Sequence, residues 1–248
     1  MTIYDPRRVH YLDALGVMRW VRRTPRLPAT GCEEPLAPAA MEKKEESVAV
    51  AETDPAAPVA TLGWSALRAR VAACTACGLH KGRTQTVFGV GNSQAEWMII
   101  GEAPGAEEDR QGEPFVGRAG QLLNAMLAAV GLRREQVFIA NILKCRPPNN
   151  RDPQPDEANA CRPFLERQIE LVNPKLILAV GRIAAQNLLQ TDAPISRLRG
   201  VVHRYGTRGI PVVVTYHPAY LLRSPGEKRK AWMDLKLALR VASEEAHS

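Results

Sequence analysis

From residue 61 onward, short apolar runs alternate with longer segments in which apolar residues recur every three or four positions. Short apolar runs are typical of buried strands, and the longer spacing is typical of helices. The pattern predicts strands at residues 97–101, 137–141, 174–181, 201–205 and 211–217. It predicts helices at residues 117–132, 155–172, 182–190 and 227–243. Alternation of this kind predicts an α/β fold, with a mostly parallel sheet covered by helices on both faces.

The first 60 residues do not continue this pattern. Residues 28–60 are rich in Pro, Ala and Glu and show neither helical nor strand periodicity, so we expect a flexible linker. Residues 1–27 place apolar residues around Leu15 at helical spacing but are too few to form a domain. We therefore expect a docking peptide at 1–27, a linker at 28–60 and one folded domain at 61–248.

Charge favours an acidic partner. The chain has 33 Lys and Arg against 26 Asp and Glu, a net charge of +7, and the linker is acidic, so the excess belongs to the folded part. Nucleic acid is the first expectation and an anionic membrane surface the second. No apolar run is long enough to span a bilayer, and the start of the chain lacks the apolar core of a secretory leader. We expect a cytoplasmic protein that associates with the nucleoid.

Polar residues stand where the predicted strands end. Glu102 follows the first strand, Asn141 ends the second and His217 ends the last. Ligands of open α/β sheets bind beyond the carboxyl ends of the strands, so a carboxylate, an amide and an imidazole should meet at one edge. Individually such residues also serve as caps and turn formers. Together they favour a functional site.

The loop that follows the first strand, residues 101–120, is long for a strand–helix connection and rich in Gly. Long connections are usually functional. It has neither the GxGxxG pattern nor the Lys-Ser/Thr pair of a phosphate loop, which disfavours a nucleotide site. Phe115 is an unexpected aromatic in this polar segment. It either anchors the loop on the core or offers a stacking surface to a planar ligand.

Four cysteines are spaced as a ligand set. Cys74 and Cys77 form Cys-x2-Cys, and Cys145 and Cys161 follow as Cys-x15-Cys. Four thiolates suit tetrahedral zinc or a [4Fe–4S] cluster, while the alternative is buried thiols that bind nothing. No ligand position is left open, so a structural role is favoured. Cys32 lies in the linker and is expected to be a free thiol.

These motifs resemble one known family. Residues 66–240 resemble the family 4 uracil-DNA glycosylases, the iron–sulfur type of bacteria and archaea. The resemblance is carried by the four cysteines and by the segments VFGVGN, GEAPG, EEDRQGEPFVGRAGQLL, IANILKCRPPNNRDPQP and TYHPAYLLR. It implies a three-layer α/β/α fold with a central, mostly parallel four-stranded sheet. It also implies a [4Fe–4S] cluster on Cys74, Cys77, Cys145 and Cys161.

The chain departs from the family pattern at two positions. Position 106 is Ala where relatives often have an acidic residue, and Ala219 follows His-Pro where Ser is common. We expect neither change to abolish activity. A sister group captures uracil DNA covalently with an added loop rich in Arg and His. CRPPNNRDPQP shows no such insertion, so covalent capture is not expected.

The implied reaction is hydrolysis of the N-glycosidic bond of deoxyuridine in DNA, which leaves an abasic site for base excision repair. The target base must first be flipped out of the stack. Phe115 would stack on the uracil, and Asn141 would pair with its N3–H and O4, which cytosine cannot match. Glu108, or the main chain near Ala103, would crowd the C5 edge and exclude thymine.

The resemblance also implies roles in bond cleavage. His217 would donate a hydrogen bond to O2 of the leaving uracil. Glu102 would position the water or stabilise the sugar cation; alternatively, it is a carboxylate that only holds the loop. No Lys is placed to form a Schiff base at this edge, so we expect a monofunctional glycosylase that does not cut the strand.

Apolar residues near the chain's end would contact DNA. Tyr220, Leu221 and Leu222 would act as a wedge that fills the gap left by the flipped base, and Arg223 would contact a phosphate. Alternatively, this segment simply packs on the final helix. Further phosphate contacts are expected from Arg118, Lys144, Arg146, Arg151 and Arg199.

Residues 1–27 resemble the start of the psi subunit of bacterial DNA polymerase III. The peptide would then tether the enzyme to the clamp loader. We expect the enzyme to be a monomer and to act on single- or double-stranded DNA that contains uracil. Two alternatives remain. One is a non-catalytic iron–sulfur module that binds DNA, which would not need Glu102, Asn141 and His217 together. The other is a polymerase-associated protein of the same superfamily.

Overall fold

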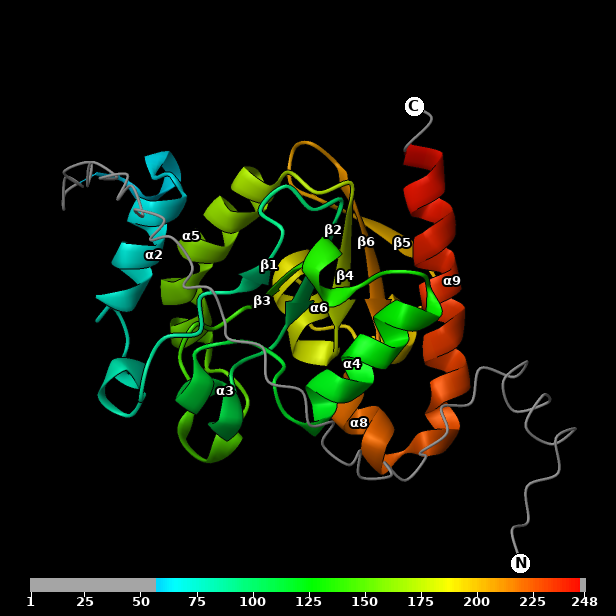
Figure 1. The fold of residues 1–248 in the computed structure, drawn as a ribbon, viewed down its shortest axis with the longest axis horizontal. Helices are drawn as coiled ribbons and strands as arrows, with labels where there is room; N and C mark the ends of the chain where they lie inside the picture. Colours follow the sequence, from blue (N-terminus) through cyan, green and yellow to red (C-terminus); the bar gives the residue numbers. More distant parts are fainter. Residues whose placement is uncertain (1–56, 246–248) are drawn as a thin grey trace, which may run out of the picture. The chain divides into compact units, whose positions relative to one another are not determined.

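A computed structural model describes residues 57–245, and the predicted docking peptide and most of the predicted linker lie outside these residues. The described residues contain a six-stranded sheet in the order β1-β3-β2-β4-β6-β5 (Figure 1). Residues 57–60, assigned to the linker from sequence, are part of this unit, because Ala57 and Val59 pack against its core.

The centre of the sheet is formed by four parallel strands. These are β2 (Trp97–Gly101), β3 (Phe138–Asn141), β4 (Leu176–Val180) and β6 (Ile210–Thr215). Every residue in them is buried, as expected of strands covered on both faces. The predicted parallel core is confirmed.

Two short antiparallel strands extend the four-stranded sheet that the resemblance implied to six strands in the described part of the chain. They are β1 (Val90–Gly91), which pairs with β3, and β5 (Val202–Tyr205), which pairs with β6. The pattern predicted β5 from its apolar start, whereas a two-residue strand such as β1 has no periodicity to read.

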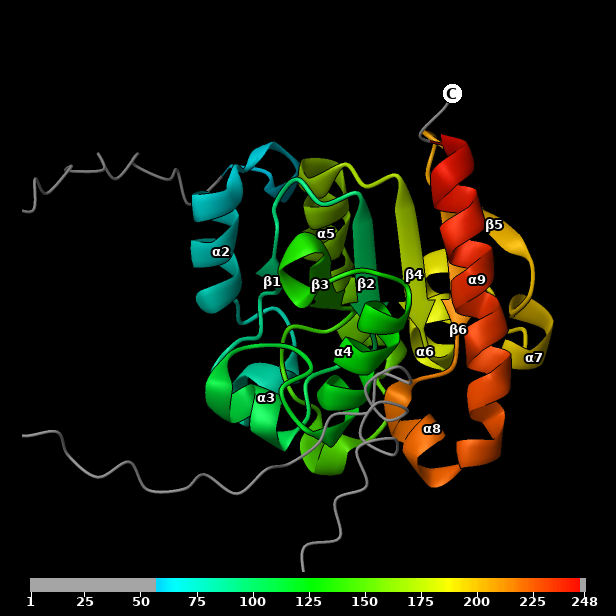
Figure 2. The same ribbon diagram turned by 45° about the vertical axis from the view of Figure 1, so that its right-hand side comes forward.

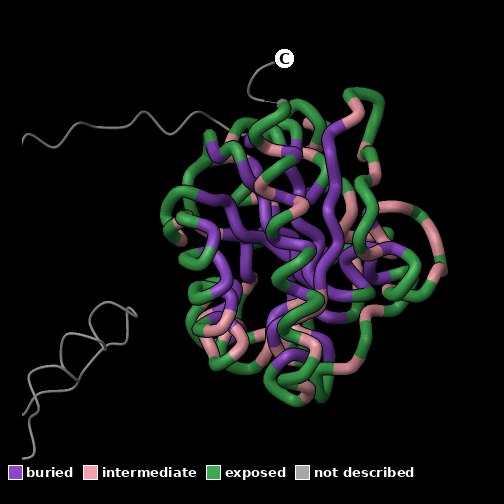
Figure 3. Tube along the Cα trace, turned by 90° about the vertical axis from the view of Figure 1, so that its right-hand side faces the viewer, coloured by how far each residue is buried: buried purple, intermediate pink, exposed green. Residues whose placement is uncertain are grey.

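Helices cover both faces of the sheet, which confirms the three-layer α/β/α class (Figures 1 and 2). One face carries α2 (Trp64–Ala72), α5 (Pro155–Val172) and α6 (Arg182–Leu189). The other carries α4 (Arg118–Ala129), α8 (Pro218–Arg223) and α9 (Lys228–Glu245). Successive β2 residues alternate between the two cores, and the buried interior follows the strands (Figure 3).

The remaining elements are short and were not predicted. They are α3 (Ala106–Gln111), α7 (Ile195–Leu198) and the 3-10 turns Val59–Thr61, Gly78–Lys81, Arg134–Gln136, Pro148–Asn150 and Pro225–Glu227. Such turns depend on local hydrogen bonds rather than on an apolar stripe, so periodicity does not reveal them. Within residues 57–245, no helix has the length and apolar character needed to cross a membrane.

Candidate active site

A cleft of about 470 Å³ opens at the carboxyl ends of the parallel strands. Glu102 follows β2, Asn141 ends β3 and His217 follows β6, and all three side chains line this cleft. The structure therefore brings together the three residues whose positions the sequence predicted to converge. Ala103, Glu108, Phe115, Tyr220 and Arg223 line the same cleft.

Asn141 lines the cleft and has a buried amide oxygen without a hydrogen-bond partner. Its side chain is 2% exposed, and Oδ1 has no hydrogen-bond partner among the described residues. A buried carbonyl oxygen without a donor is costly, so it points to a ligand that supplies one. Gly101 allows this arrangement, since a Cβ there would lie 2.5 Å from Asn141 Oδ1 and 2.6 Å from Phe115 Cζ.

Phe115 is held in an unusual backbone conformation. Its φ of 54° is rare for a bulky residue, and such strain is maintained only where the surroundings impose it. Arg134 Nη1 donates to the Phe115 carbonyl oxygen over 3.3 Å, and the absence of a side chain at Gly120 leaves room for that carbonyl. The ring is buried and stacks on His217, with centroids 5.5 Å apart and 29° between the planes.

Glu108 ties the two ends of the loop that carries Phe115. Its Oε1 accepts from the main-chain N–H groups of Val116 and Gly117, and its Oε2 accepts from that of Gly105, all within 3.2 Å. Glu108 lines the cleft, but both carboxylate oxygens are already bonded to the loop. In this arrangement Glu108 sets the position of Phe115. Ala103 also lines the cleft, and the main chain near it stays the other group predicted to crowd the C5 edge of the base.

The bonding of His217 defines its tautomer. Nδ1 accepts a hydrogen bond from the main-chain N–H of Ala219 over 3.2 Å, so in the neutral ring Nε2 carries the proton. Burial, assisted by the cation of Arg223, lowers the pKa of His217 to about 4. The ring is therefore neutral at pH 7 and able to donate from Nε2. Because the main chain makes this bond, Ala at position 219 preserves it.

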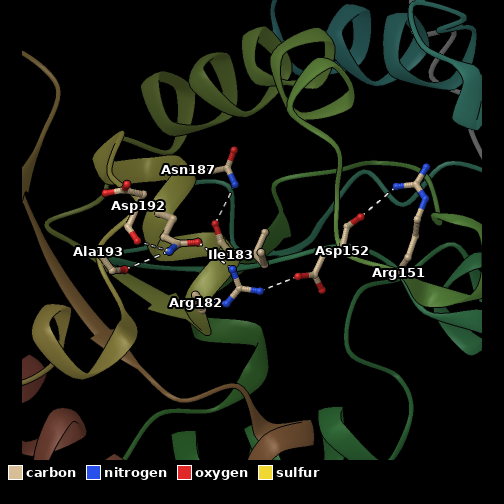
Figure 4. Close-up of polar contacts among 8 residues, drawn as sticks. Arg151, Asp152, Arg182, Ile183, Asn187, Asp192 and Ala193 are labelled. Atoms are coloured by element: carbon tan, nitrogen blue, oxygen red, sulfur yellow. Dashed lines mark hydrogen bonds and ion pairs between the residues drawn. The ribbon is translucent and has the colours of Figure 1, made fainter.

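The pKa of Glu102 is shifted upward, whereas that of His217 is shifted downward. Burial, and next the charge of Asp152, raise its pKa from 4.5 to about 7, while Arg182 opposes the rise. Arg182 and Asp152 form an ion pair of 2.6 Å, and Arg151 donates to the main-chain oxygen of Asp152 (Figure 4). Asp152 and Arg182 were not singled out from sequence, because the loop after Cys145 and the start of α6 meet only in the fold.

The side chains of residues 220–223, the last four residues of α8, fall into two groups. Tyr220 and Leu222 are 36% and 37% exposed, and Arg223 lines the cleft. Leu221 is 1% exposed and packs with the core between the sheet and α9. The prediction of Leu221 as a DNA wedge is not supported, since its side chain would have to leave the core to reach DNA.

Lys144 also differs from expectation. It was predicted to contact phosphates, but its side chain is 1% exposed, and burial lowers its pKa to about 8. Arg199 is paired with the buried Asp234 over 2.7 Å and lies 4.1 Å over the Tyr216 ring. Both cations therefore serve the interior of the domain, a role that a basic residue type alone does not reveal.

The four spaced cysteines surround a second, smaller cavity. Cys74, Cys77, Cys145 and Cys161 all line it, although the first two come from the segment after α2, the third from the loop after β3 and the fourth from α5. Hydrogen bonds reach three of the sulfurs. Cys74 accepts from Ala76 N, Cys145 from Arg83 Nη1 at 3.2 Å and Cys161 from Lys144 N at 3.3 Å. Arg83 was missed from sequence, and it also donates to the carbonyls of Ala72 and Cys74.

Among the described residues, no group of three or more Cys, His, Asp or Glu side chains is arranged so that it could hold a single metal ion. A four-iron cluster needs a different arrangement, with four thiolates around one cavity, each on its own iron. The cysteines and their N–H donors are compatible with that requirement, since such donors stabilise thiolate charge.

Comparison with known proteins defines the class. The family model described as the Uracil DNA glycosylase superfamily matches residues 88–236, more than half of the chain. All strands of the described sheet and the residues that line the cleft at the strand ends lie within this match, and the chain belongs to that superfamily.

Relatives narrow the assignment to a family. A type-4 uracil-DNA glycosylase of Archaeoglobus fulgidus is 49% identical over 67% of this chain and 86% of its own length. Those of Sulfurisphaera tokodaii and Thermotoga maritima are 44% and 48% identical over 68% and 62% of this chain and 80% and 81% of their own lengths. The chain is a member of the type-4 family, which confirms the resemblance read from the motifs.

Proposed function

We propose that the cleft removes uracil from DNA by hydrolysis of the N-glycosidic bond, with the residues described above in defined roles. The chain is a DNA glycosylase, a hydrolase acting on N-glycosyl bonds, as its family membership indicates. The observation that carries the residue assignment is the buried Asn141 Oδ1, which lacks a donor and lies beside the Phe115 ring.

Base recognition follows from the donor and acceptor pattern. Asn141 Oδ1 accepts from uracil N3–H, and its amide nitrogen donates to O4. Cytosine has an acceptor at N3 and a donor at position 4, so it would leave both pairs mismatched in a buried site. Phe115 supplies the stacking surface, and Glu108 acts indirectly by holding the loop in place.

His217 stabilises the leaving group. As the C–N bond breaks, negative charge develops on the uracil, and a neutral Nε2–H is suited to donate to O2. A positioned donor of this kind contributes roughly 3 kcal/mol to transition-state stabilisation in a site that excludes water. The low pKa of His217 keeps the ring uncharged throughout the neutral range, and the bond from the Ala219 N–H keeps its proton on Nε2.

Glu102 acts on the sugar side. Its ionised form accepts a proton from the attacking water and stabilises positive charge on the sugar. With a pKa raised to about 7, it is a base with the strength suited to neutral pH. Lys side chains are not among the described residues that line the cleft, which supports a monofunctional glycosylase without Schiff-base chemistry.

The proposal includes a [4Fe–4S] cluster held by Cys74, Cys77, Cys145 and Cys161. Its chemistry there would be that of a covalent cross-link among thiolates, which fixes the start of the domain to α5 and to the segment after β3. The N–H groups that reach three of the sulfurs support this assignment.

DNA is the partner of the proposed reaction. Tyr220, which lines the cleft, and Leu222, which is exposed on the same short helix, would fill the space left by the flipped nucleotide, and Arg223 would contact a phosphate. Binding of residues 1–27 to a clamp loader, the monomeric state and a nucleoid location remain predictions.

The test is uracil release from labelled oligonucleotides, single-stranded and as a U·G duplex, followed by alkali. We expect strand breaks only at uracil and only after alkali. Breaks without alkali would contradict the monofunctional assignment. An inactive protein with its full iron content would favour the non-catalytic binding module.

A further inference from the structure

Lys144 is the largest fully buried side chain in the described part of the chain. Its Nζ donates to the main-chain oxygen of Asn141 over 2.8 Å and to Gln168 Oε1 over 2.6 Å. Burying an ammonium is costly unless acceptors replace its water, and here two do so. Because this burial is costly, we expect the two hydrogen bonds of the ammonium to hold the groups that accept them in place.

That place is the end of strand β3. Asn141 is the last residue of β3, and its main-chain oxygen points to the Lys144 ammonium rather than to a neighbouring strand. Its side chain enters the cleft, so rotation of this peptide unit would move the amide. The Lys144 bond thus restrains the residue proposed to recognise the base.

Gln168 is the second acceptor of the Lys144 ammonium and is itself held by a hydrogen bond to the main chain. It lies on α5, is fully buried, and donates from Nε2 to the main-chain oxygen of Phe88 over 2.8 Å. Its Oε1 is thereby oriented toward Lys144. The chain of bonds runs from the segment before β1, through Gln168 and Lys144, to Asn141.

The same residue contacts the cysteine cavity. The Lys144 main-chain N–H donates to Cys161 Sγ over 3.3 Å, and Lys144 is among the residues that line the cavity. One residue therefore joins the cysteine site to the base-recognition residue by hydrogen bonds alone.

We propose that Lys144, supported by Gln168, is a positioning residue for base selection, because it holds the Asn141 peptide so that the side-chain amide faces the base. This inference rests on the proposed role of Asn141. It predicts that removing the Lys144 donor weakens recognition of uracil even when the fold and the bound iron are retained.

The primary test is Lys144→Met, which keeps the length and apolar volume of the side chain but removes the donor. The readout is the affinity for an oligonucleotide carrying 2′-fluoro-deoxyuridine, a non-cleavable analogue, relative to the matched thymidine oligonucleotide. We expect this preference to fall about tenfold or more, since a lost bond from a charged donor is worth about 1.5–3 kcal/mol. Thermal stability and iron per chain are measured on the same preparations.

A double variant separates positioning from stability. Lys144→Met alone leaves Gln168 Oε1 buried without a donor, and adding Gln168→Met removes that acceptor. Because the same change also removes the donor to the Phe88 oxygen, the free energy of unfolding should move from its Lys144→Met value, whereas the uracil preference should not, because the Asn141 oxygen still lacks its donor. Gln168→Met alone substitutes no residue next to Cys145 in the sequence. It is expected to give a smaller loss, which keeps the test decisive if Lys144→Met does not fold.

Leu235→Ala is the matched control, since it destabilises the core on the other face of the sheet and Leu235 is not among the residues that line the cleft. An unchanged uracil preference in folded Lys144→Met, or equal loss in Leu235→Ala, would overturn the inference. If Lys144→Met does not fold, an unchanged preference in Gln168→Met would do the same. Asn141→Ala tests the underlying role. If it keeps the full preference, the proposed function of Asn141 fails, and this is distinguishable from failure of Lys144 alone.

Discussion

The ionisation of Glu102 gives the most specific test of the proposed mechanism. Burial and Asp152 raise the pKa of Glu102 from 4.5 to about 7, and only the ionised carboxylate can accept the proton of the attacking water. Uracil release should therefore increase with pH across the neutral range, even though ordinary carboxylic acids are fully ionised there.

The size of the effect follows from the pKa. With a value of about 7, the ionised fraction is about one tenth at pH 6, one half at pH 7 and nine tenths at pH 8. The rate of the chemical step should then rise about tenfold between pH 6 and pH 8. An unperturbed Glu with a pKa near 4.3 would give a rate that is nearly constant over this range.

The assay is single-turnover uracil release with saturating enzyme at each pH, so that changes in DNA affinity do not enter the rate. Asp152→Asn removes a charge that, together with burial, raises the pKa of Glu102, and it also frees Arg182. The rise of the rate with pH should therefore move to lower pH. Arg182→Gln removes the cation that lowers the pKa of Glu102, so the rise of the rate should move to higher pH. Both residues are largely exposed, and the variants should fold normally.

Glu102→Gln is the control. It should lower the rate of uracil release and abolish the rise of that rate between pH 6 and pH 8. A rate in the wild-type protein that does not change between pH 6 and pH 8 would refute the reasoning. If neither Asp152→Asn nor Arg182→Gln displaces the rise in rate, the contributions assigned to these two charges are wrong and burial alone sets the pKa.

Other substitutions test the remaining parts of the site. His217→Ala should slow uracil release about 10²–10³-fold in single turnover with unchanged DNA affinity, and a normal rate would exclude its role. Leu222→Ala should reduce activity on a U·G duplex more than on single-stranded DNA, whereas equal losses would argue against a wedge. Arg83→Leu removes the donor to Cys145, and iron retention against a chelator should weaken about tenfold; unchanged retention would dismiss that contact. Gly101→Ala should abolish uracil release in a folded protein, since the added Cβ meets Asn141 Oδ1; full activity would show that the pocket adapts.

The main elements could be predicted because they depend on local pattern. Helix α5 has the predicted bounds, and the four parallel strands lie where continuous apolar runs predicted them. The parallel arrangement then made it predictable that Glu102, Asn141 and His217 meet at one edge. Short elements such as α3 could not be predicted, because α3 is stabilised by Glu108, which bonds to residues up to nine positions away.

The amino-acid sequence by itself determined the fold class, the edge of the sheet at which the site lies, the cysteine set and the family, because each depends on residue type and spacing. Tertiary structure decided what each side chain contacts. It buried Leu221 and Lys144, bonded Glu108 to its own loop, and placed Asp152 and Arg182 beside Glu102. The reason is physical: burial, dielectric environment and hydrogen bonds between distant segments arise only when the layers pack, and they set both pKa and orientation.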